Sequence, residues 1–207
     1  MIAIVDYGVG NLFSLVSSFK AIGAEAVATG DKKVIESADK IVLPGVGAFS
    51  DAAKKLFDSG LAVVVKEQAA KGKPLLGICL GMQLLFDKSL EYGEHQGLGL
   101  IPGQVRPISE VIPKTLKIPH IGWNALEFGK NKNKLFKYLK EGEHVYFVHS
   151  YYGANCSDNV AATTEYGATL TAAVAKDNVY CCQFHPEKSG KAGLNILRAF
   201  CEMEGVK

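Results

Sequence analysis

The amino-acid sequence predicts an α/β fold: an open, mixed and mostly parallel sheet flanked by helices, with an antiparallel extension. Two observations lead to this fold class. In the first half of the chain, short β-branched runs alternate with amphipathic helical segments. In the second half, strand-like segments follow one another without intervening helices. The first pattern implies parallel strands joined by right-handed crossovers, whereas the second favours antiparallel pairing.

The size and composition of the chain favour one folded domain. A chain of 207 residues can bury most of its surface around a single core, so we expect one domain over residues 1–207. Its 48% hydrophobic and 21% charged residues are typical of globular proteins. The net charge of +2 gives no reason to expect nucleic acid or an anionic membrane as a partner. Apolar runs stay shorter than the ~18 residues of a membrane span.

The N-terminus and the cysteines indicate a cytoplasmic protein. The chain opens on a strand-like segment, Ile2–Val5, without the basic and long apolar regions of a secretion signal. Its five cysteines are odd in number and lack the spacing of zinc ligands. We therefore expect free thiols in a reducing compartment, and neither a metal ion nor another cofactor.

The elements of the first half can be placed in order. Ile2–Val5 is a buried strand, and Asn11 is placed to cap a helix that Gly23 ends. The following elements are strands over Ala24–Ala28 and Lys40–Leu43, a helix capped by Ser50, a helix over Leu61–Ala70, a strand over Pro74–Ile78 and a helix over Met82–Phe86.

The second half contributes the antiparallel part and a closing helix. Its predicted strands are Gln104–Ile108, Val145–His149, Val160–Thr164, Thr171–Ala175 and Val179–Phe184. A last amphipathic helix carries Leu194, Leu197, Phe200 and Cys201 on one face.

A possible nucleophile lies where the strand ending at Ile78 meets the next helix. Gly77-Ile78-Cys79-Leu80-Gly81 has the form of a nucleophile elbow, Gly-x-nucleophile-x-Gly, with Cys in the place of Ser. The helix N-terminus behind such a turn favours a thiolate. The N–H of Leu80 would point to where an oxyanion develops. Taken alone, the pattern fits a buried structural cysteine equally well.

A base and its partner follow near the C-terminus, in Gln183-Phe184-His185-Pro186-Glu187. Pro186 holds His185 extended, and residues two apart in an extended chain point the same way, so His185 and Glu187 are expected to project together. A carboxylate beside an imidazole fixes its tautomer and leaves the other nitrogen free to take a thiol proton. The pair therefore favours a Cys79–His185–Glu187 triad over a surface turn.

A glycine-rich segment, Pro44-Gly45-Val46-Gly47, follows an earlier strand at the edge where open α/β sheets bind ligands. The N–H of Val46 or Gly47 would supply a second oxyanion donor. An ordinary turn is the alternative interpretation.

Together, these three segments resemble the class I (triad) glutamine amidotransferases. The resemblance implies a flavodoxin-like sheet and a reaction in which the cysteine attacks the side-chain amide of glutamine, ammonia leaves, and water hydrolyses the glutamyl thioester. It further implies that residues around the glutamine pocket are Gln83, Glu91, Ser150 and Tyr151. Glu91 has a surface charge as its alternative interpretation, and for His149 we favour a structural role.

The chain is similar over its full length to the glutaminase subunits of imidazole glycerol phosphate synthase. The segments that carry this likeness are Asp6–Asn11, Pro119–Asn124, Val148–Tyr151 and His185–Ser189. The likeness implies a heterodimer with a (β/α)₈ cyclase subunit that uses the ammonia in histidine biosynthesis. Trp123, expected in a loop, would then anchor the docking surface together with Asn124 and Lys188. Lys188 could equally be a solvated lysine.

Two alternatives remain open from the sequence. One is a triad glutaminase that serves another synthase, and the other is a non-catalytic module on the same fold. The Gly-Trp-Asn segment at 122–124 argues against the first, and the retained triad argues against the second.

Overall fold

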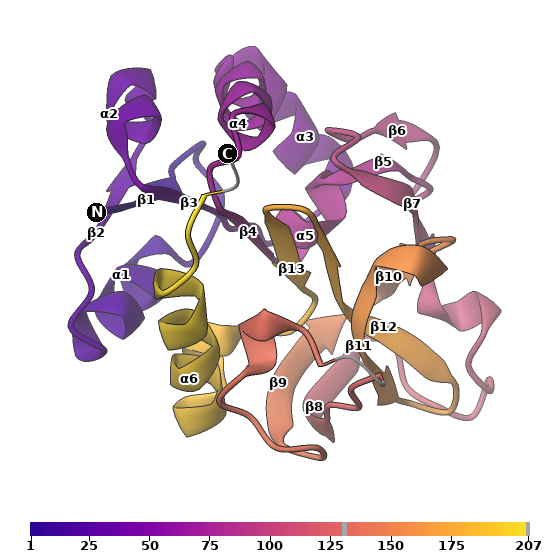
Figure 1. The fold of residues 1–207 in the computed structure, drawn as a ribbon. Coiled ribbons are helices and arrows are strands. Elements are labelled where there is room, and N and C mark those ends of the chain that lie inside the picture. Colours follow the sequence, from indigo (N-terminus) through magenta and orange to yellow (C-terminus); the bar gives the residue numbers. More distant parts are fainter. Residues whose placement is uncertain (130–131, 206–207) are drawn as a thin grey trace.

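The structure is a computed structural model that describes residues 1–129 and 132–205. Figure 1 shows a central twisted sheet with helices on both faces and two smaller sheets beside it. The central sheet has seven strands among the described residues, in the order β11-β12-β13-β4-β3-β1-β2. Their bounds are β1 Ile2–Val5, β2 Ala26–Thr29, β3 Lys40–Leu43, β4 Leu75–Ile78, β11 Val160–Glu165, β12 Thr169–Lys176 and β13 Val179–Cys182.

The parallel part of this sheet has a flavodoxin-like order. Strands β2, β1, β3, β4 and β13 are parallel to one another, and β12 and β11 continue the sheet in antiparallel pairing. Strand order reverses between β1 and β3, the place where ligands bind at the carboxyl ends of the strands in such sheets. The predicted fold class is confirmed, including the antiparallel extension.

Helices cover both faces of the sheet and close two apolar cores. On one face lie α1 (Leu12–Ala21) and α6 (Gly190–Cys201), which contact each other. The opposite face is covered by α2 (Lys32–Ser37), α3 (Phe49–Asp58) and α4 (Leu61–Ala70). The short α5 (Leu80–Leu84) follows β4 directly. Because β13 is buried on both faces, Cys181 packs in one core and Cys182 in the other.

Two smaller sheets pack against the rest of the fold, one within each of the two apolar cores. One contains β10 (Tyr151–Ala154), β7 (Ile101–Pro107), β5 (Phe86–Ser89) and β6 (His95–Gln96), in that order. The other pairs β8 (His120–Ala125) with β9 (His144–His149). Short 3₁₀ turns lie at η1 (Ile108–Glu110), η2 (Lys134–Phe136), η3 (Ser157–Asn159) and η4 (Pro186–Lys188). The predicted strands Gln104–Ile108 and Val145–His149 therefore exist, but they pair outside the central sheet.

Several local predictions were wrong. Helix α3 begins at Phe49 and not after Ser50, because the N–H of Phe49 donates to Glu91 Oε2 at 2.5 Å, a contact between residues far apart in the sequence. Helix α5 ends at Leu84, and Phe86 already pairs in β5. Asn11 is the N-cap residue of α1 as predicted, but its side chain makes no capping hydrogen bond.

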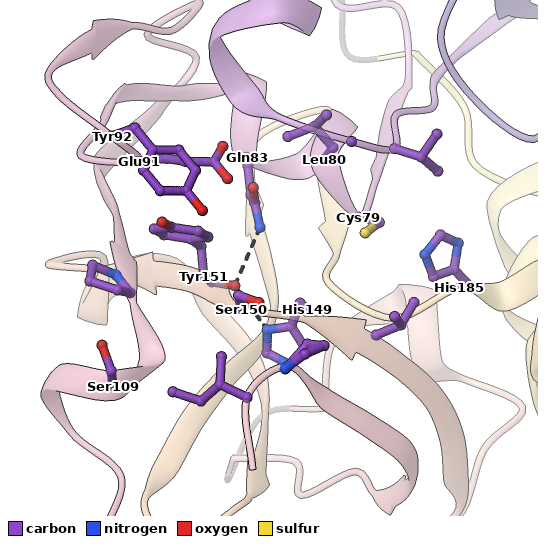
Figure 2. A pocket seen from close by; sticks show the side chains of 16 residues that line it. Cys79, Leu80, Gln83, Glu91, Tyr92, Ser109, His149, Ser150, Tyr151 and His185 are labelled. Carbon is purple, nitrogen blue, oxygen red and sulfur yellow. Dashed lines mark hydrogen bonds between the residues drawn. The ribbon is translucent and has the colours of Figure 1, made fainter. Parts of the chain in front are cut away.

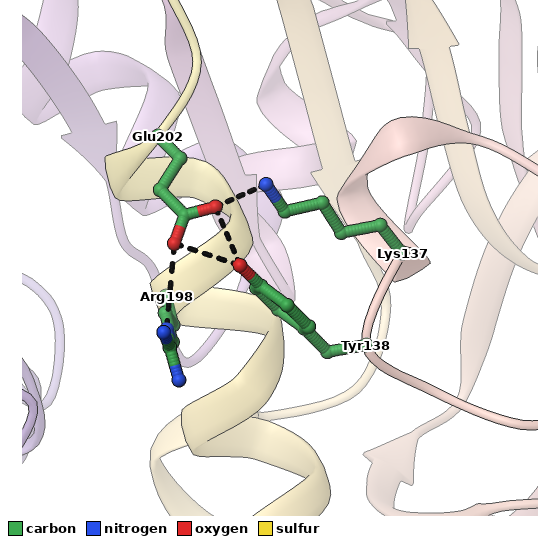
Figure 3. A network of polar contacts seen from close by, with 4 residues as sticks. All are labelled: Lys137, Tyr138, Arg198 and Glu202. Carbon is green, nitrogen blue, oxygen red and sulfur yellow. Dashed lines mark hydrogen bonds and ion pairs between the residues drawn. The ribbon is translucent and has the colours of Figure 1, made fainter.

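A polar cluster ties α6 to the chain after η2 (Figure 3). Tyr138 Oη donates to both carboxylate oxygens of Glu202, at 2.9 and 2.8 Å. Lys137 and Arg198 form ion pairs with the same carboxylate. These groups are largely exposed, so we expect the cluster to orient α6 rather than add much stability.

None of the described helices has the length and apolar character needed to cross a membrane.

Candidate active site

Cys79 lies on a strained turn between β4 and α5. Its φ of 55° and ψ of −112° are uncommon for a residue with a side chain. Glycine is required at position 81, because an added Cβ would lie 1.9 Å from the carbonyl oxygen of Leu43. The N–H of Cys79 donates to the carbonyl of Cys182 at 2.8 Å, which ties the turn to β13. This is the geometry of a nucleophile elbow.

His185 and Glu187 form the second part of the site. His185 follows β13, and its Nδ1 lies 2.8 Å from Glu187 Oε1, with only 3% and 1% of the two side chains exposed. Burial disfavours a charged His185, but hydrogen bonds to Cys79 and Glu187 outweigh it and raise the pKa of His185 to about 10. The Cys79 sulfur and the Glu187 carboxylate thus favour the protonated form of the imidazole between them.

The contact between His185 and Glu187 was predicted from an extended backbone, and this explanation was only partly right. Residue His185 is extended, with φ −101° and ψ 99°, as expected before a proline. Glu187, however, lies in the 3₁₀ turn η4 and not on an extended strand. The turn folds the carboxylate back onto the imidazole.

The segment after β3 faces the elbow. Tyr7, in the turn after β1, donates its hydroxyl to the carbonyl of Pro44 at 2.7 Å and so holds the start of this segment. Gly47 has φ 90°, a conformation that favours glycine, and it lines the same cavity as Val46. As the first residue of α5, Leu80 has an N–H without an acceptor in the preceding turn. The structure thus brings all three predicted oxyanion residues to the cavity.

A cavity of about 480 Å³ connects these residues to the predicted substrate positions. Figure 2 shows Cys79 and His185 at one end, and Glu91 with Tyr92 at the other. The cavity is lined by Val46, Gly47, Cys79, Leu80, Gln83, Glu91, Tyr92, Pro107, Ser109, Ile118, Pro119, Val148, His149, Ser150, Tyr151 and His185. All four predicted substrate residues are in this set.

Glu91 is a buried carboxylate and not a surface charge. It is 9% exposed, and its Oε2 accepts the N–H of Phe49 at the start of α3. The side chain therefore joins the far end of the cavity to the helix that follows Gly47.

The three predicted docking residues lie outside the cavity. Trp123 was expected in a loop, but it lies in strand β8, 53% exposed and 6.0 Å from the ring of Tyr146. Lys188 places its Nζ 5.9 Å from the same ring, so Trp123 and Lys188 flank Tyr146 on one surface. Asn124 instead uses its side chain within the fold, since its Nδ2 donates to the carbonyl of Glu165 at 2.8 Å.

Three residues near the site had no role in the sequence-based interpretation: Tyr7, His120 and Gln183. His120 is buried between the rings of Phe147 and Tyr166, with its Nδ1 3.0 Å from His149 Nε2. Gln183 is fully buried beside Cys79. In the sequence, a role for Gln183 could have been inferred because it is a polar residue in the otherwise apolar run Val179–Phe184. Nothing in the sequence around His120 indicated its buried position.

The buried His149 is expected to make the protein less stable in acid. Burial lowers the pKa of His149 to about 4, although the hydrogen bond to the Tyr151 carbonyl acts in the opposite direction. Between pH 6.5 and 4 the unfolded chain therefore binds a proton that the folded chain does not, so stability falls as the pH falls through this window. This difference between the pKa values of the unfolded and folded states corresponds to about 3 kcal/mol in the free energy of unfolding.

Thermal unfolding of the protein and of a His149→Gln variant at pH 4 to 8 would measure this contribution. The variant is expected to lose less stability than the unchanged protein between pH 6.5 and 4. Parallel pH profiles would contradict the assignment.

Comparisons with known proteins identify the class. Residues 3–203 match the family model described as glutamine amidotransferase class-I. A solved structure described as a glutamine amidotransferase shares the fold, with a TM-score of 0.75, 20% sequence identity and 98% of each chain covered.

Closer relatives identify the family within that class. The chain is 50% identical over 204 residues to the imidazole glycerol phosphate synthase subunit HisH of Caldanaerobacter subterraneus subsp. tengcongensis, covering 98% of each chain. It is 49% identical over 199 residues to the HisH subunit of Aquifex aeolicus, covering 95% of this chain and 94% of the relative. The chain therefore belongs to the HisH family of class I glutamine amidotransferases.

Proposed function

We propose that the protein hydrolyses L-glutamine to glutamate and ammonia through a thioester on Cys79. The observation that carries this proposal is the convergence of Cys79 and His185 at one end of a cavity whose other end is a buried carboxylate. The thiolate of Cys79 attacks the amide carbon of glutamine, and the His185 imidazolium gives its proton to the departing ammonia. Neutral His185 then takes a proton from the water that hydrolyses the thioester.

Glu187 keeps His185 in the required tautomer during both steps. Its Oε1 accepts from Nδ1, which leaves Nε2 for the thiol and the leaving group. The N–H of Leu80 and that of Val46 or Gly47 stabilise the oxyanion of each tetrahedral intermediate.

The rest of the cavity holds the glutamine backbone. We infer that the buried carboxylate of Glu91, which lines the same cavity as Cys79, accepts the α-ammonium group. Gln83, Ser150 and Tyr151 supply polar groups between the two ends.

The partner is inferred to be a cyclase subunit with a (β/α)₈ barrel fold, bound as a heterodimer. The relatives are named as subunits of imidazole glycerol phosphate synthase, which supports this inference. The cyclase would use the ammonia to form imidazole glycerol phosphate and aminoimidazole carboxamide ribotide in histidine biosynthesis. Trp123 and Lys188 are exposed on one surface, and with Asn124 they remain our candidates for docking. We also infer one domain over 1–207 and a cytoplasmic location.

Glutaminase activity is expected to depend on the cyclase. The glycines on both sides of Val46 allow its peptide to rotate, so docking of the loaded cyclase can set the second oxyanion donor. Such a donor contributes about 10²- to 10³-fold in rate. We expect glutamate release to rise by about that factor when the cyclase and its nucleotide ligand are added together. Equal rates with and without them would contradict the gating mechanism.

A glutaminase that serves another synthase is the second candidate function. Assaying imidazole glycerol phosphate after mixing the chain with a cyclase separates the two, because only the proposed function makes this product depend on glutamine. The identity of about 50% to HisH subunits favours the first candidate.

A further inference from the structure

A buried amide, Gln183, contacts the sulfur of Cys79. Its Nε2 lies 3.7 Å from Cys79 Sγ, within hydrogen-bonding distance for sulfur, and the residue is 0% exposed. The backbone N–H of Gln183 donates to the carbonyl of Ala172 at 2.8 Å, which holds the residue at the end of β13. The sulfur therefore has a neutral contact in addition to His185.

The direction of this amide is set by a carbonyl on the other side of the cavity. The carbonyl oxygen of Tyr151 can only accept hydrogen bonds, so the Gln83 group 3.3 Å away must be its NH₂. The same Nε2 of Gln83 donates to Gln183 Oε1 at 3.0 Å. With its oxygen committed to Gln83, Gln183 must present its NH₂ to the sulfur. Figure 2 shows the first contact of this series, between Gln83 and the Tyr151 carbonyl.

We propose that Gln183 is a catalytic residue that donates a hydrogen bond to the Cys79 thiolate, and that Gln83 is a positioning residue that orients it. This deepens the proposed glutaminase function and rests on the assignment of Cys79 as the nucleophile. A hydrogen bond to a charged acceptor stabilises the charged form. Gln183 thus supports the thiolate, but it gives up no proton during the reaction.

The two donors to the sulfur therefore have different tasks. His185 gives its proton to ammonia in the first half of the reaction and takes one from the attacking water in the second. In that second half the C–S bond breaks, and its electron pair returns to the sulfur as a thiolate. A donor on the sulfur makes it a better leaving group. Gln183 donates to the sulfur without changing its own protonation, and because it stabilises the leaving thiolate its main contribution is to thioester hydrolysis.

Alkylation of Cys79 tests the contact without glutamine. The Gln183→Met variant keeps a side chain of similar size but removes the donor. We expect the pH at which iodoacetamide alkylation of Cys79 reaches half its plateau rate to rise by roughly 0.5 to 1 unit, from the strength of one hydrogen bond. Titratable groups around Cys79 are Tyr7, Cys182, His185 and, behind His185, Glu187 and His149, all of which the variant retains.

The reaction intermediate provides the second readout. With the cyclase and its ligand bound, Gln183→Met is expected to lower kcat by about 3- to 10-fold and to lower the KM for glutamine with it, because slower thioester hydrolysis leaves kcat/KM unchanged. Acid quenching followed by mass spectrometry should then find a larger fraction of the chain as the glutamyl thioester. A structural role alone would lower the amount of active protein without raising that fraction.

A matched control comes from α4, where Gln68 is 4% exposed and lies outside the site. Gln68→Met is expected to leave the alkylation profile and the thioester fraction unchanged. If Gln183→Met does not fold, the alkylation profile of Gln83→Met tests the proposal instead. In that variant Gln183 loses the partner that orients it, so the pH midpoint of Cys79 alkylation should also rise.

The outcomes separate this inference from the proposed function. An unchanged midpoint in the folded variant overturns the role of Gln183, even if Cys79 remains the most reactive cysteine. If peptide mapping shows that Cys79 alkylates no faster than the other cysteines, the assignment of Cys79 as the nucleophile fails instead.

Discussion

Replacing Cys79 by alanine is expected to lower glutamine-dependent product formation by the assembled synthase by about 10⁴-fold or more. The substitution removes the only atom that forms a covalent bond to the substrate in the proposed mechanism. Oxyanion donors and His185 cannot replace it, because without the sulfur no thioester forms. Glutamate release, measured with cyclase and ligand present, checks the loss.

Two controls make the result specific to the nucleophile. Ammonium salt supplied in place of glutamine should restore cyclase turnover, because the cyclase consumes ammonia and its own site is unchanged. Cys201→Ala, a cysteine substitution on α6 away from the cavity, should leave glutamate release unaltered. Retained glutamate release in Cys79→Ala would refute the thioester mechanism.

Gly81→Ala is expected to destabilise the protein and to disrupt the elbow. The new methyl group would lie 1.9 Å from the carbonyl oxygen of Leu43 and 2.7 Å from its carbon, and both are backbone atoms of the buried strand β3. Backbone this deep cannot move away without disturbing the sheet, so we expect a cost of about 3 kcal/mol. For a protein of this size, Tm should fall by roughly 6 to 12 °C.

Gly129→Ala is the matched control for this substitution. An added Cβ at Gly129 meets no atom within 4 Å, and its backbone needs no left-handed conformation. Its effect should stay within about 0.5 kcal/mol. A Tm for Gly81→Ala equal to that of Gly129→Ala would show that the turn can expand.

The fold class and the proximity of Cys79, His185 and Glu187 could be predicted because each depends on a local pattern, whereas the catalytic roles of these residues stay a prediction. Glycines two residues on either side of Cys79 mark the turn, and Pro186 marks the extended backbone of His185. Alternating strands and helices in the first half predicted the parallel sheet in the same way.

The errors occurred where a distant contact outweighs the local pattern. Helix α3 starts at Phe49 because Glu91 accepts its N–H, and nothing near Ser50 in the sequence reveals that carboxylate. Trp123 lies between a glycine and an asparagine, which favour turns, yet the whole segment pairs with β9. The role inferred for Gln183 depends on the direction of its amide, which is set by a carbonyl 32 positions earlier in the chain.

The carbonyl of Tyr151 also ends a second series of contacts, which leads away from Cys79. It accepts from His149 Nδ1 at 2.8 Å. His149 Nε2 lies 3.0 Å from His120 Nδ1, and His120 Nε2 lies 2.9 Å from Asn124 Oδ1. Asn124 cannot reverse its amide, because its NH₂ is required by the carbonyl of Glu165.

The two neutral imidazoles carry one N–H fewer than these three contacts need. Both end contacts need an N–H on a ring nitrogen, and the central contact needs a third, whereas two neutral rings carry only two. Burial keeps the pair neutral by lowering the pKa of both rings. One of the three contacts must therefore lack its proton: the one at the Tyr151 carbonyl, the one between the rings or the one at Asn124. The choice is a coupled tautomeric equilibrium of His149 and His120, and it links Asn124 on β8 to the carbonyl that orients Gln83.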